Sequence, residues 1–368
     1  MVKENRAKLL WLCKKRYMRQ DVIDDRYGRL FHLPVELSAN FDVSAICIDY
    51  RSHGRPLEVC IDGVRFVSVF LGQFAFGALA LVFFFRKLLL REKYHVVVSS
   101  SDCLQVLLGC YLAKRFDAKF IVDLYDNYES FGLAKLPFVR RYYRKALKQA
   151  DLVVAVSGTL KKFVVGNFNK KCIVVESTIQ EGMFARVAPG ALSEKIREIG
   201  DVVVGVGGGL DAGHDINTLF AAMKSITADH KNIHFVFAGK ASAELLACCD
   251  SNIHAIGPLK HAQMPEFFCA LDLTVVGLAD NDFGRFAFPQ KAYEILACET
   301  PVVVADVGAL AELFVDYPNL RYRPGDSESL AECILMQLVQ REVVGLNVPT
   351  WQQKGLVLAD HIAACLVE

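Results

Sequence analysis

The sequence predicts an α/β protein of two Rossmann-like, doubly wound domains that face each other across a cleft. Short apolar runs alternate with helical patterns along nearly the whole chain, which is typical of parallel sheets with right-handed crossovers. The 368 residues exceed what one core usually holds. The domain boundary is expected within residues 178–200, a segment near the middle of the chain that contains Gly182, Pro189 and Gly190. Ligands of such folds bind beyond the carboxyl ends of the strands, so we expect the site in the cleft.

We expect an N-terminal domain over residues 1–185, a C-terminal domain over residues 186–352, and a last helical segment over residues 353–368. The apolar runs of the first half predict strands at 8–13, 43–48, 65–71, 95–100, 119–125, 152–157 and 172–177. Helical patterns fall between them, notably at 104–116 and 136–150. In the second half, a first strand is predicted to begin at residue 201. Further strands are predicted at 233–239, 253–257, 273–278, 302–306 and 320–325.

Composition indicates a well-buried globular protein, because 53% of its residues are hydrophobic and no low-complexity tract occurs. Its twelve cysteines are scattered singly apart from Cys248-Cys249, without C-x-x-C spacing. A zinc or disulfide framework is therefore not expected, and so many unpaired thiols fit a reducing compartment. The N-terminal apolar run is short and is interpreted as a first strand rather than a signal peptide. We expect a cytoplasmic protein.

Charge is distributed unevenly although the net charge is only +1. Residues 1–185 contain 29 Lys and Arg against 18 Asp and Glu, an excess of 11 positive charges. Residues 186–368 contain 13 against 23, an excess of 10 negative charges. This asymmetry indicates an anionic partner for the first half, for which membrane lipid, a pyrophosphate-linked acceptor and nucleic acid are candidates.

Two segments of the first half are candidates for contact with a membrane. Residues 66–85 are uncharged over the length of a membrane span, but Gly72-Gln73 divides them, so we predict a strand followed by a buried or membrane-dipping helix. Residues 136–150 interleave aromatic residues with the basic residues Arg140, Arg141, Arg144 and Lys145. This composition suits a helix on anionic lipid. No nucleic-acid fold motif accompanies it, so we expect no nucleic-acid partner; a plain solvated face is the alternative.

A glycine-rich turn follows the first strand of the second half at residues 205–209 and precedes a helix that starts near Asp215. Glycines there let the backbone approach a phosphate, and the helix N-terminus favours an anion. Gly207, Gly209 and Ala212 also imitate a dinucleotide fingerprint. That motif needs an acid at the end of the next strand, where this chain has Gly239-Lys240. A phosphate-binding turn is therefore preferred to an NAD site, with a tight turn without ligand as the alternative.

Residues 288–304, FPQKAYEILACETPVVV, contain the strongest functional signal. Lys291 and Glu294 are three residues apart and share one face of a short helix that Pro289 opens. The lysine offers a positive charge to a phosphate, and the glutamate can accept hydrogen bonds from a ribose diol. An ordinary amphipathic helix is the alternative. Together with the glycine-rich turn, the pattern indicates a nucleoside diphosphate.

The segment P-x-K-x-x-E-x-x-A followed by PVV resembles the nucleotide-sugar site of GT-B glycosyltransferases, in particular glycosyltransferase family 4. The resemblance implies that the donor is bound by Glu294 and by six further residues, through their side chains or their backbone. These are Lys291, Gly207, Gly208, Gly209, Lys240 and Lys260. It also implies a C-terminal helix that packs back on the N-terminal domain. The chain departs from the family where a diphosphate-clamping Arg and Lys are usual: it has Leu210 and then His214-Asp215. Phe286 stands where a second acid is common.

Asp126 is the predicted catalytic residue. It follows the apolar strand ending near Asp123, so its carboxylate is expected at the carboxyl end of that strand. An acceptor hydroxyl needs a group that takes or holds its proton during transfer, with Asp123 and Glu129 as second choices. Helix capping or chain turning is the alternative role.

The charged segment after the first strand contains Gly28, flanked by Arg26 and Arg29, which would meet an acceptor phosphate. A solvated charge run is the alternative.

These observations and the resemblance predict a metal-independent glycosyltransferase without a cofactor, since the nucleotide sugar, most simply a UDP sugar, is a substrate. The acceptor expected is a lipid-linked saccharide or a surface polysaccharide. The enzyme is expected on the inner face of the cell membrane as a peripheral protein. Two alternatives stay open: a catalytically silent GT-B subunit that binds membrane or a partner transferase, which the missing clamp favours, and a nucleotide-sugar epimerase.

Overall fold

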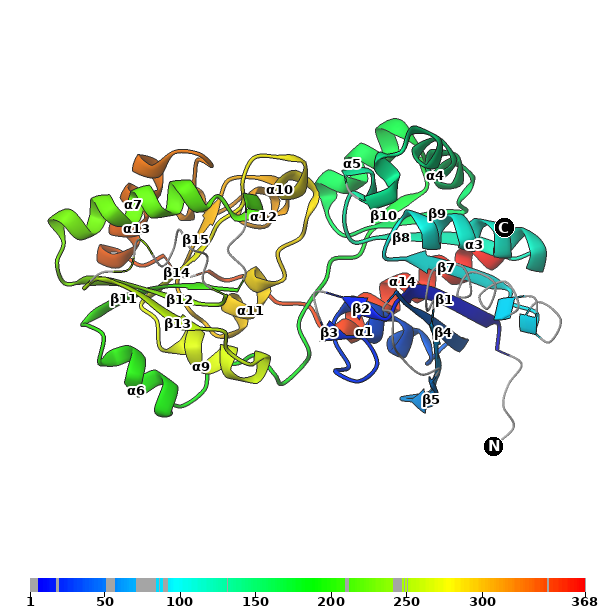
Figure 1. Ribbon diagram of the computed structural model, residues 1–368, viewed down its shortest axis with the longest axis horizontal. Helices are drawn as coiled ribbons and strands as arrows, with labels where there is room; N and C mark the ends of the chain where they lie inside the picture. The colour runs from blue at the N-terminus through cyan, green and yellow to red at the C-terminus, as the bar shows by residue number, and fades with distance from the viewer. Residues whose placement is uncertain are drawn as a thin grey trace. The chain divides into compact units, whose positions relative to one another are not determined.

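The computed structural model describes residues 6–17, 20–50, 57–70, 84–85, 87–88, 92–130, 132–208, 212–240, 247, 249, 251–342 and 344–367. The chain divides into two compact units: unit 1, Met1–Ser177 with Thr350–Glu368, and unit 2, Thr178–Pro349. Each unit is a parallel α/β structure with helices on its sheet (Figure 1). The predicted fold class of two Rossmann-like halves is confirmed.

The sheet of unit 1 has the strand order β10-β9-β8-β7-β1-β4-β6-β5. Seven strands are parallel: β1 (Lys8–Lys14), β4 (Asp42–Asp49), β6 (Val64–Phe70), β7 (Val96–Ser100), β8 (Lys119–Leu124), β9 (Leu152–Ala155) and β10 (Cys172–Val174). All seven lie in runs that the sequence predicted as strands. The edge strand β5 (Leu57–Ile61), which was not predicted, pairs antiparallel with β6 through a turn at Asp62-Gly63. Both turn residues have positive φ (48° and 83°), as tight hairpin turns require.

Helices cover both faces of the unit 1 sheet. Helices α3 (Cys103–Phe116) and α4 (Pro137–Gln149) pack together on one side, while α1 (Arg29–Leu37) and α14 (Trp351–Val367) pair on the other (Figure 1). The last helix of the chain thus belongs to unit 1. Helix α14 passes so near α1 that a Cβ on Gly355 would lie 2.2 Å from the Cβ of Glu36.

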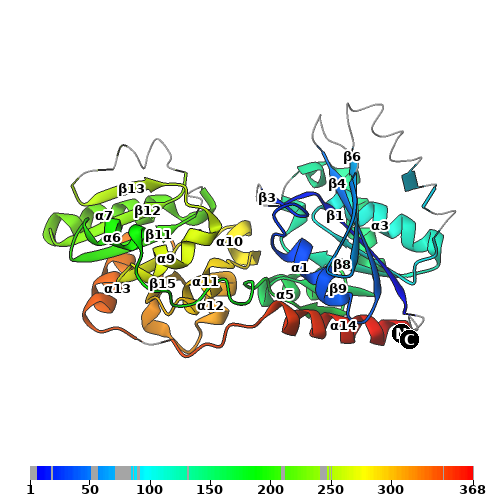
Figure 2. The same ribbon diagram turned by 90° about the horizontal axis from the view of Figure 1, so that it is seen from below.

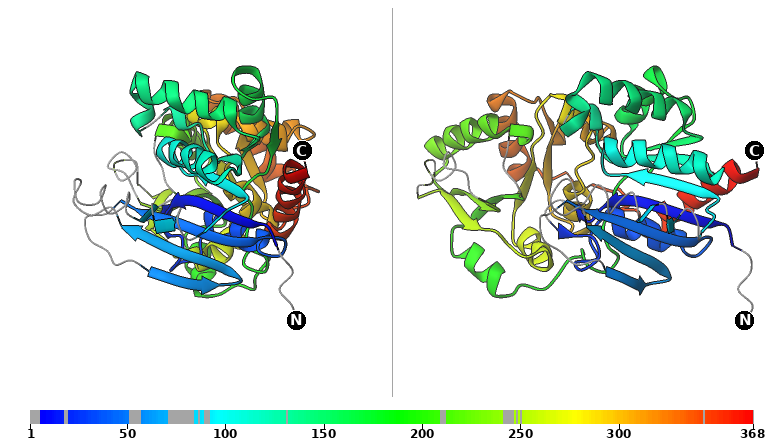
Figure 3. Two further views of the ribbon diagram at one scale, coloured as in Figure 1. Left: turned by 90° about the vertical axis from the view of Figure 1, so that its right-hand side faces the viewer. Right: turned by 45° about the vertical axis from the view of Figure 1, so that its right-hand side comes forward.

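The sheet of unit 2 has the order β13-β12-β11-β14-β15-β16, and all its strands are parallel. Their bounds are β11 (Val202–Gly207), β12 (Ile233–Ala238), β13 (Ile253–Gly257), β14 (Leu273–Val276), β15 (Val302–Ala305) and β16 (Arg321–Tyr322). Helices α7 (Ile216–Asp229) and α13 (Ser327–Val339) pack together on one face of this sheet. Helices α6 (Ala191–Arg197) and α9 (Met264–Cys269) pack together on the other (Figures 1 and 3).

Both sheets are wound outward from a central pair of strands, β1 and β7 in unit 1 and β11 and β14 in unit 2 (Figure 1). Figure 2 shows β1, β4 and β6 side by side in unit 1. Counted along the chain, the parallel strands of unit 2 follow the order 3-2-1-4-5-6, and those of unit 1 follow the same order with a seventh strand added. In such sheets the chain leaves the two central strands in opposite directions, which opens a crevice beyond their carboxyl ends. These edges are therefore where function is to be sought.

The uncharged run 66–85 is described only in part. Its first five residues, 66–70, belong to β6, as predicted, whereas residues 71–83 lie outside the described residues. Among the residues that the structure describes, no helix has the length and apolarity needed to cross a membrane.

Candidate functional site

Three turns meet at the carboxyl edge of the unit 2 sheet. Strands β11, β12 and β13 are in register there, with Gly207 beside Ala238 and Ala238 beside Gly257. The Gly208 N–H donates to the carbonyl of Ala238 (2.7 Å), and the Gly239 N–H donates to that of Gly257 (2.9 Å). The predicted glycine-rich turn is thus bonded to the end of β12, which is bonded in turn to the end of β13.

Glycine is required at two positions of this edge, Gly208 after β11 and Gly239 after β12. Gly208 has φ 96°, a conformation that L side chains rarely adopt. A Cβ on Gly239 would lie 2.1 Å from the Gly208 carbonyl oxygen, closer than any real contact. The two backbones therefore touch at this edge of the sheet.

Lys291 lies against the same turn. It is the first residue of α11 (Lys291–Ala297), and its Nζ donates to the carbonyl of Gly207 at 2.6 Å. A Cβ on Gly208 would lie 2.5 Å from this Nζ, so the ammonium group occupies the space that the glycine leaves open. Lys291, Gly207 and Gly208, which the sequence placed in one donor site, are together in the structure.

Glu294 lies one helical turn further along α11 and is buried, with 6% of its surface exposed. Its Oε1 is 3.4 Å from Nε2 of His261 and accepts from Nε2 of Gln290 at 3.3 Å. The His261 ring stacks edge-on against Phe184, with ring centroids 5.2 Å apart. The sequence analysis singled out neither His261 nor Gln290; the available signal was the position of His261 shortly after β13.

The remaining predicted donor contacts are less defined. Lys240 and Lys260 are exposed and follow β12 and β13 at the same edge of the sheet. Gly209 lies outside the described residues. The family has its clamping lysine near the position of Asp215. The Asp215 carboxylate accepts hydrogen bonds from Thr218 Oγ1 (2.7 Å) and from the Gly325 N–H (2.9 Å), so it stabilises the local structure and offers no positive charge to a phosphate.

In unit 1, Asp126 follows β8 in a half-buried position. Burial raises the pKa of its carboxyl from 3.8 to about 6, although the N–H of Asn127, which donates to Oδ1 at 2.7 Å, opposes this shift. A carboxylate with a pKa near the working pH suits proton transfer to and from a substrate.

Asp123 and Arg29 do not have the surroundings that the sequence predicted. Both side chains are fully buried. Arg29 Nε donates to both Asp123 carboxylate oxygens at 3.0 Å, and Nη2 donates to Oδ1 at 2.5 Å. An acceptor phosphate could reach this guanidinium only by displacing Asp123, so we correct the interpretation of Arg29 from an acceptor contact to a buried ion-pair partner. Arg26 is exposed and lies 3.9 Å from an Asp62 carboxylate oxygen.

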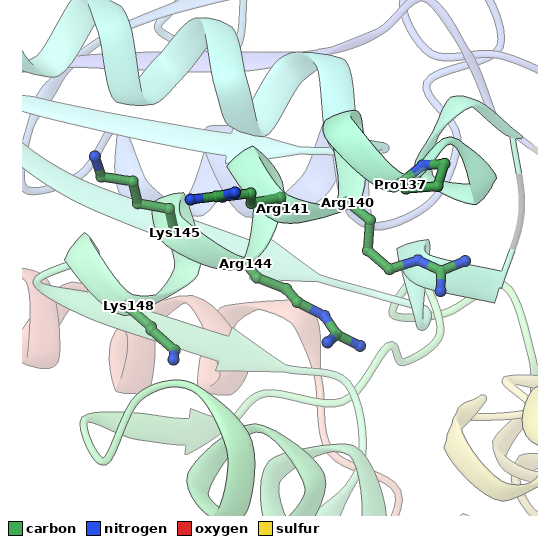
Figure 4. A pocket seen from close by; sticks show the side chains of 6 residues that line it. All are labelled: Pro137, Arg140, Arg141, Arg144, Lys145 and Lys148. Carbon is green, nitrogen blue, oxygen red and sulfur yellow. The ribbon is translucent and has the colours of Figure 1, made fainter.

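A basic hollow lies on α4 (Figure 4). Its lining consists of Pro137 and five basic residues, and its volume is about 420 Å³. The basic residues are Arg140, Arg141, Arg144, Lys145 and Lys148. Arg144 forms a bidentate ion pair with Glu129 (2.7 and 2.8 Å), which joins α4 to the segment after β8. Phe138 and Tyr142 on the same helix are about 60% exposed.

Metal ligands are not grouped in the part of the chain that the structure describes: no three or more His, Cys, Asp or Glu residues there are placed to hold one ion. The acidic segment 280–282 serves its own loop. Asp280 pairs with Arg285 (2.6 Å), and Asn281 caps α10 (Asp282–Phe286) by accepting from the Gly284 N–H.

Known structures resemble the whole chain in fold. Sucrose-phosphate synthase from Thermosynechococcus elongatus has a TM-score of 0.70 at 15% identity, covering 98% of this chain and 97% of that one. Anabaena HepE in complex with UDP has 0.67 at 15%, covering 98% and 97%. The Escherichia coli structure described as trehalose-6-phosphate bound with UDP-2-fluoro glucose has 0.67 at 11%, covering 98% and 95%. No curated protein matches the sequence significantly. At these identities the likeness shows the GT-B fold.

Family models match both halves of the chain. The model described as "Glycosyl transferase 4-like domain" matches residues 32–171, which lie in unit 1. The model described as "Glycosyl transferases group 1" matches residues 201–340, which lie in unit 2 and include the glycine turn, Lys291 and Glu294. The chain therefore belongs to the group 1, family 4-like glycosyltransferases with the GT-B fold.

Proposed function

We propose that this glycosyltransferase uses a nucleoside-diphosphate sugar, most simply a UDP sugar, as its donor. The observation that carries the proposal is the joint position of Lys291 and the Gly207–Gly208 turn, with Nζ 2.6 Å from the Gly207 carbonyl. The fold neighbours support UDP, since Anabaena HepE was solved with UDP and with UDP and glucose.

In this proposal Lys291 and the backbone N–H groups of the glycine turn meet the diphosphate. Cleavage of the glycosidic bond leaves an additional negative charge on that diphosphate. A fixed ammonium group and oriented peptide dipoles stabilise such charge without reorganising, so no metal is needed for this role. Glu294, held by His261 and Gln290, accepts hydrogen bonds from the ribose hydroxyls. Lys240 and Lys260 extend the positive edge.

Asp126 takes or holds the proton of the acceptor hydroxyl in unit 1. Its raised pKa, about 6, means that the carboxylate is largely ionised at neutral pH yet still basic enough to accept a proton.

We further propose that the acceptor is a lipid-linked saccharide or a surface polysaccharide and that α4 docks on the anionic, cytoplasmic face of a membrane. The basic side chains of the α4 hollow are exposed or half-exposed, and Phe138 and Tyr142 stand beside them with about 60% of their surfaces exposed. Basic residues attract anionic lipid, each contributing roughly 1 kcal/mol near the surface, while aromatic side chains enter the headgroup layer. The exposed Arg26 contacts an acceptor phosphate in this proposal, and the buried Arg29 does not.

Calorimetric titration with UDP, GDP and dTDP sugars tests the donor. The Lys291→Ala variant is expected to bind UDP about tenfold more weakly and uridine unchanged, because only the diphosphate meets the ammonium group. Lys195→Ala, on the exposed side of α6, is the matched control and should bind both like the wild type. Equal losses for UDP and uridine would contradict the role given to Lys291. Failure of every nucleotide to bind would favour the silent subunit, and a changed free nucleotide sugar would favour the epimerase.

Vesicle co-sedimentation tests the membrane. The wild type should bind phosphatidylglycerol vesicles and not phosphatidylcholine vesicles, and Arg141→Glu with Lys145→Glu should lose this binding. The control, Lys195→Glu with Lys224→Glu in unit 2, changes the net charge equally and should bind normally. If both double variants lose binding to the same extent, the attraction is general and α4 is not the docking surface.

A further inference from the structure

We infer that Arg29 and Asp123 are positioning residues, which hold the segment that carries Asp126 in its working geometry. The inference deepens the proposed function and rests on the role of Asp126 given there. It assigns a task to a buried charge pair that contacts neither donor nor acceptor.

The guanidinium of Arg29 connects three parts of unit 1. Arg29 is the first residue of α1, and its Nε and Nη2 bind the Asp123 carboxylate at the end of β8. Its Nη1 donates to the carbonyl of Val175, the residue after β10, at 2.5 Å. Planar bidentate pairing fixes the direction of the carboxylate as well as its distance. The end of β8 is therefore held in orientation against a helix and a second strand.

Asp123 is also tied to the central part of the sheet. Its Oδ2 accepts from Ser100 Oγ, at the end of β7, at 2.7 Å. Its backbone carbonyl accepts from the hydroxyl of Tyr128 at 3.1 Å. Because Asp123 and Tyr128 bond to each other, the chain between them forms a closed loop. Asp126 lies within that loop.

A strained residue completes the arrangement. Ser101 has φ 94°, which is unusual for a residue with a side chain and tends to occur where function requires it. Its N–H donates to the Tyr128 hydroxyl at 3.0 Å, and its carbonyl accepts from the Tyr125 hydroxyl at 3.1 Å. The residues on both sides of Asp126 are thereby bonded to the turn after β7, where the two halves of the unit 1 sheet diverge.

Stability alone does not account for this pair. Taking two charges out of water costs several kcal/mol per ion, and replacing a buried pair by apolar residues is often neutral or stabilising. An apolar pair would fill the same space but would not set the direction of the β8 end. Misplacement of a catalytic group by about 1 Å can lower a rate about a hundredfold, so such orientation has a functional value.

The test compares Arg29→Met/Asp123→Leu, which removes both charges, with Lys354→Met, which removes a charge from the half-buried Lys354–Glu176 pair elsewhere in unit 1. Turnover is measured as UDP release from the UDP sugar that binds best, with water as the acceptor of the sugar. We expect the double variant to fold, to lose about tenfold to a hundredfold in kcat, and to keep its KM for the donor, which unit 2 binds. Lys354→Met should keep both.

A pH profile separates positioning from a general loss of stability. Burial, and to a smaller extent the charge of Asp126, raises the pKa of three tyrosine hydroxyls: Tyr17 of β2 (Arg16–Tyr17), the neighbouring Tyr125 and Tyr143 of α4. Loosening the loop admits water, so the acid limb of kcat/KM, expected near pH 6, should move toward pH 4 in the double variant. Arg29→Lys, which keeps the charge, should recover part of kcat and the wild-type limb.

A folded double variant with wild-type kcat and an unshifted limb would overturn the inference. If that variant does not fold, the test rests on Arg29→Lys. A wild-type kcat in Arg29→Lys would overturn the inference, and a reduced kcat with an unchanged KM for the donor would support it. Asp126→Asn distinguishes this from a failure of the proposed function. If Asp126→Asn turns over normally, the role of Asp126 is wrong; if it is inactive while the double variant keeps the wild-type kcat, only the positioning role is wrong.

Discussion

The two units share one winding of strands but present different chemistry at the carboxyl edges of their sheets. In unit 2 the edge is main chain: Gly208 and Gly239 touch, and a single ammonium group lies on the Gly207 carbonyl. In unit 1 the edge consists of carboxylates and hydroxyls locked by a buried ion pair. A common topology therefore fixes where a site lies and not what it does.

This difference suits two tasks. A diphosphate carries its own charge and needs donors that approach closely, which glycine turns allow. An acceptor hydroxyl is neutral and needs a base of suitable pKa, which burial of a carboxylate provides. Variants that affect one edge and spare the other are the sharpest tests of this division.

The largest effect is expected from Asp126→Asn in unit 1. Loss of the proton acceptor should lower kcat by about a hundredfold or more, while calorimetric binding of UDP stays at the wild-type value. Glu129→Gln, three residues away and paired with Arg144, is the control and should retain most of the turnover. Weaker UDP binding in Asp126→Asn would mean that the two edges are not separate in function.

In unit 2 the corresponding test is Gly239→Ala. Its Cβ would lie 2.1 Å from the Gly208 carbonyl oxygen, so the glycine turn has to move. Overpacking of this kind costs about 1–3 kcal/mol, and the affinity for UDP should fall by about tenfold to a hundredfold. Gly345→Ala, where the nearest atom is 3.5 Å from the new Cβ, is the matched control. An unchanged affinity in Gly239→Ala would show that the turn does not contact the donor.

Much of the fold was predictable from the sequence because buried parallel strands are continuous apolar runs, such as residues 152–155 and 302–305. The edge strand β5 was not, because only part of its surface is buried and its sequence, LEVCI, lacks that continuity. Its hairpin depends on Asp62-Gly63, a short turn signal that was not interpreted as one.

The proposed donor site was more predictable than the proposed acceptor side. Lys291 and Glu294 lie on one short helix, so local spacing indicated their common orientation. Arg29 and Asp123 are 94 positions apart, and both are charged residues of a type usually found at the surface. Only the packing of α1 against the end of β8 shows that they neutralise each other, and a single sequence does not contain that information.

A smaller effect is expected from Glu294→Gln, which separates ribose binding from diphosphate binding within unit 2. Removing the charge that accepts the ribose hydroxyls should weaken UDP and uridine alike, by about tenfold, because a hydrogen bond to a charged group contributes about 1.5–3 kcal/mol. Pyrophosphate binding should stay unchanged, the reverse of the pattern expected for Lys291→Ala. If pyrophosphate binding also weakens, Glu294 acts by holding the turn rather than by binding ribose.

The smallest effect concerns the stability of unit 1 as a function of pH. The pKa of Asp126 is about 6 in the folded chain against 3.8 for an exposed Asp, so folding favours its protonated form. The folded state is therefore penalised as pH rises from about 4 to about 6, by at most ~3 kcal/mol for a shift of this size. Asp126→Asn removes the penalty but still desolvates an amide, so we expect a gain of about 1 kcal/mol at pH 7 and none at pH 4. Urea unfolding of both proteins at the two pH values measures this. An equal difference at both pH values would mean that the carboxyl titrates normally, and Asp126 would then lack the basicity on which its catalytic role depends.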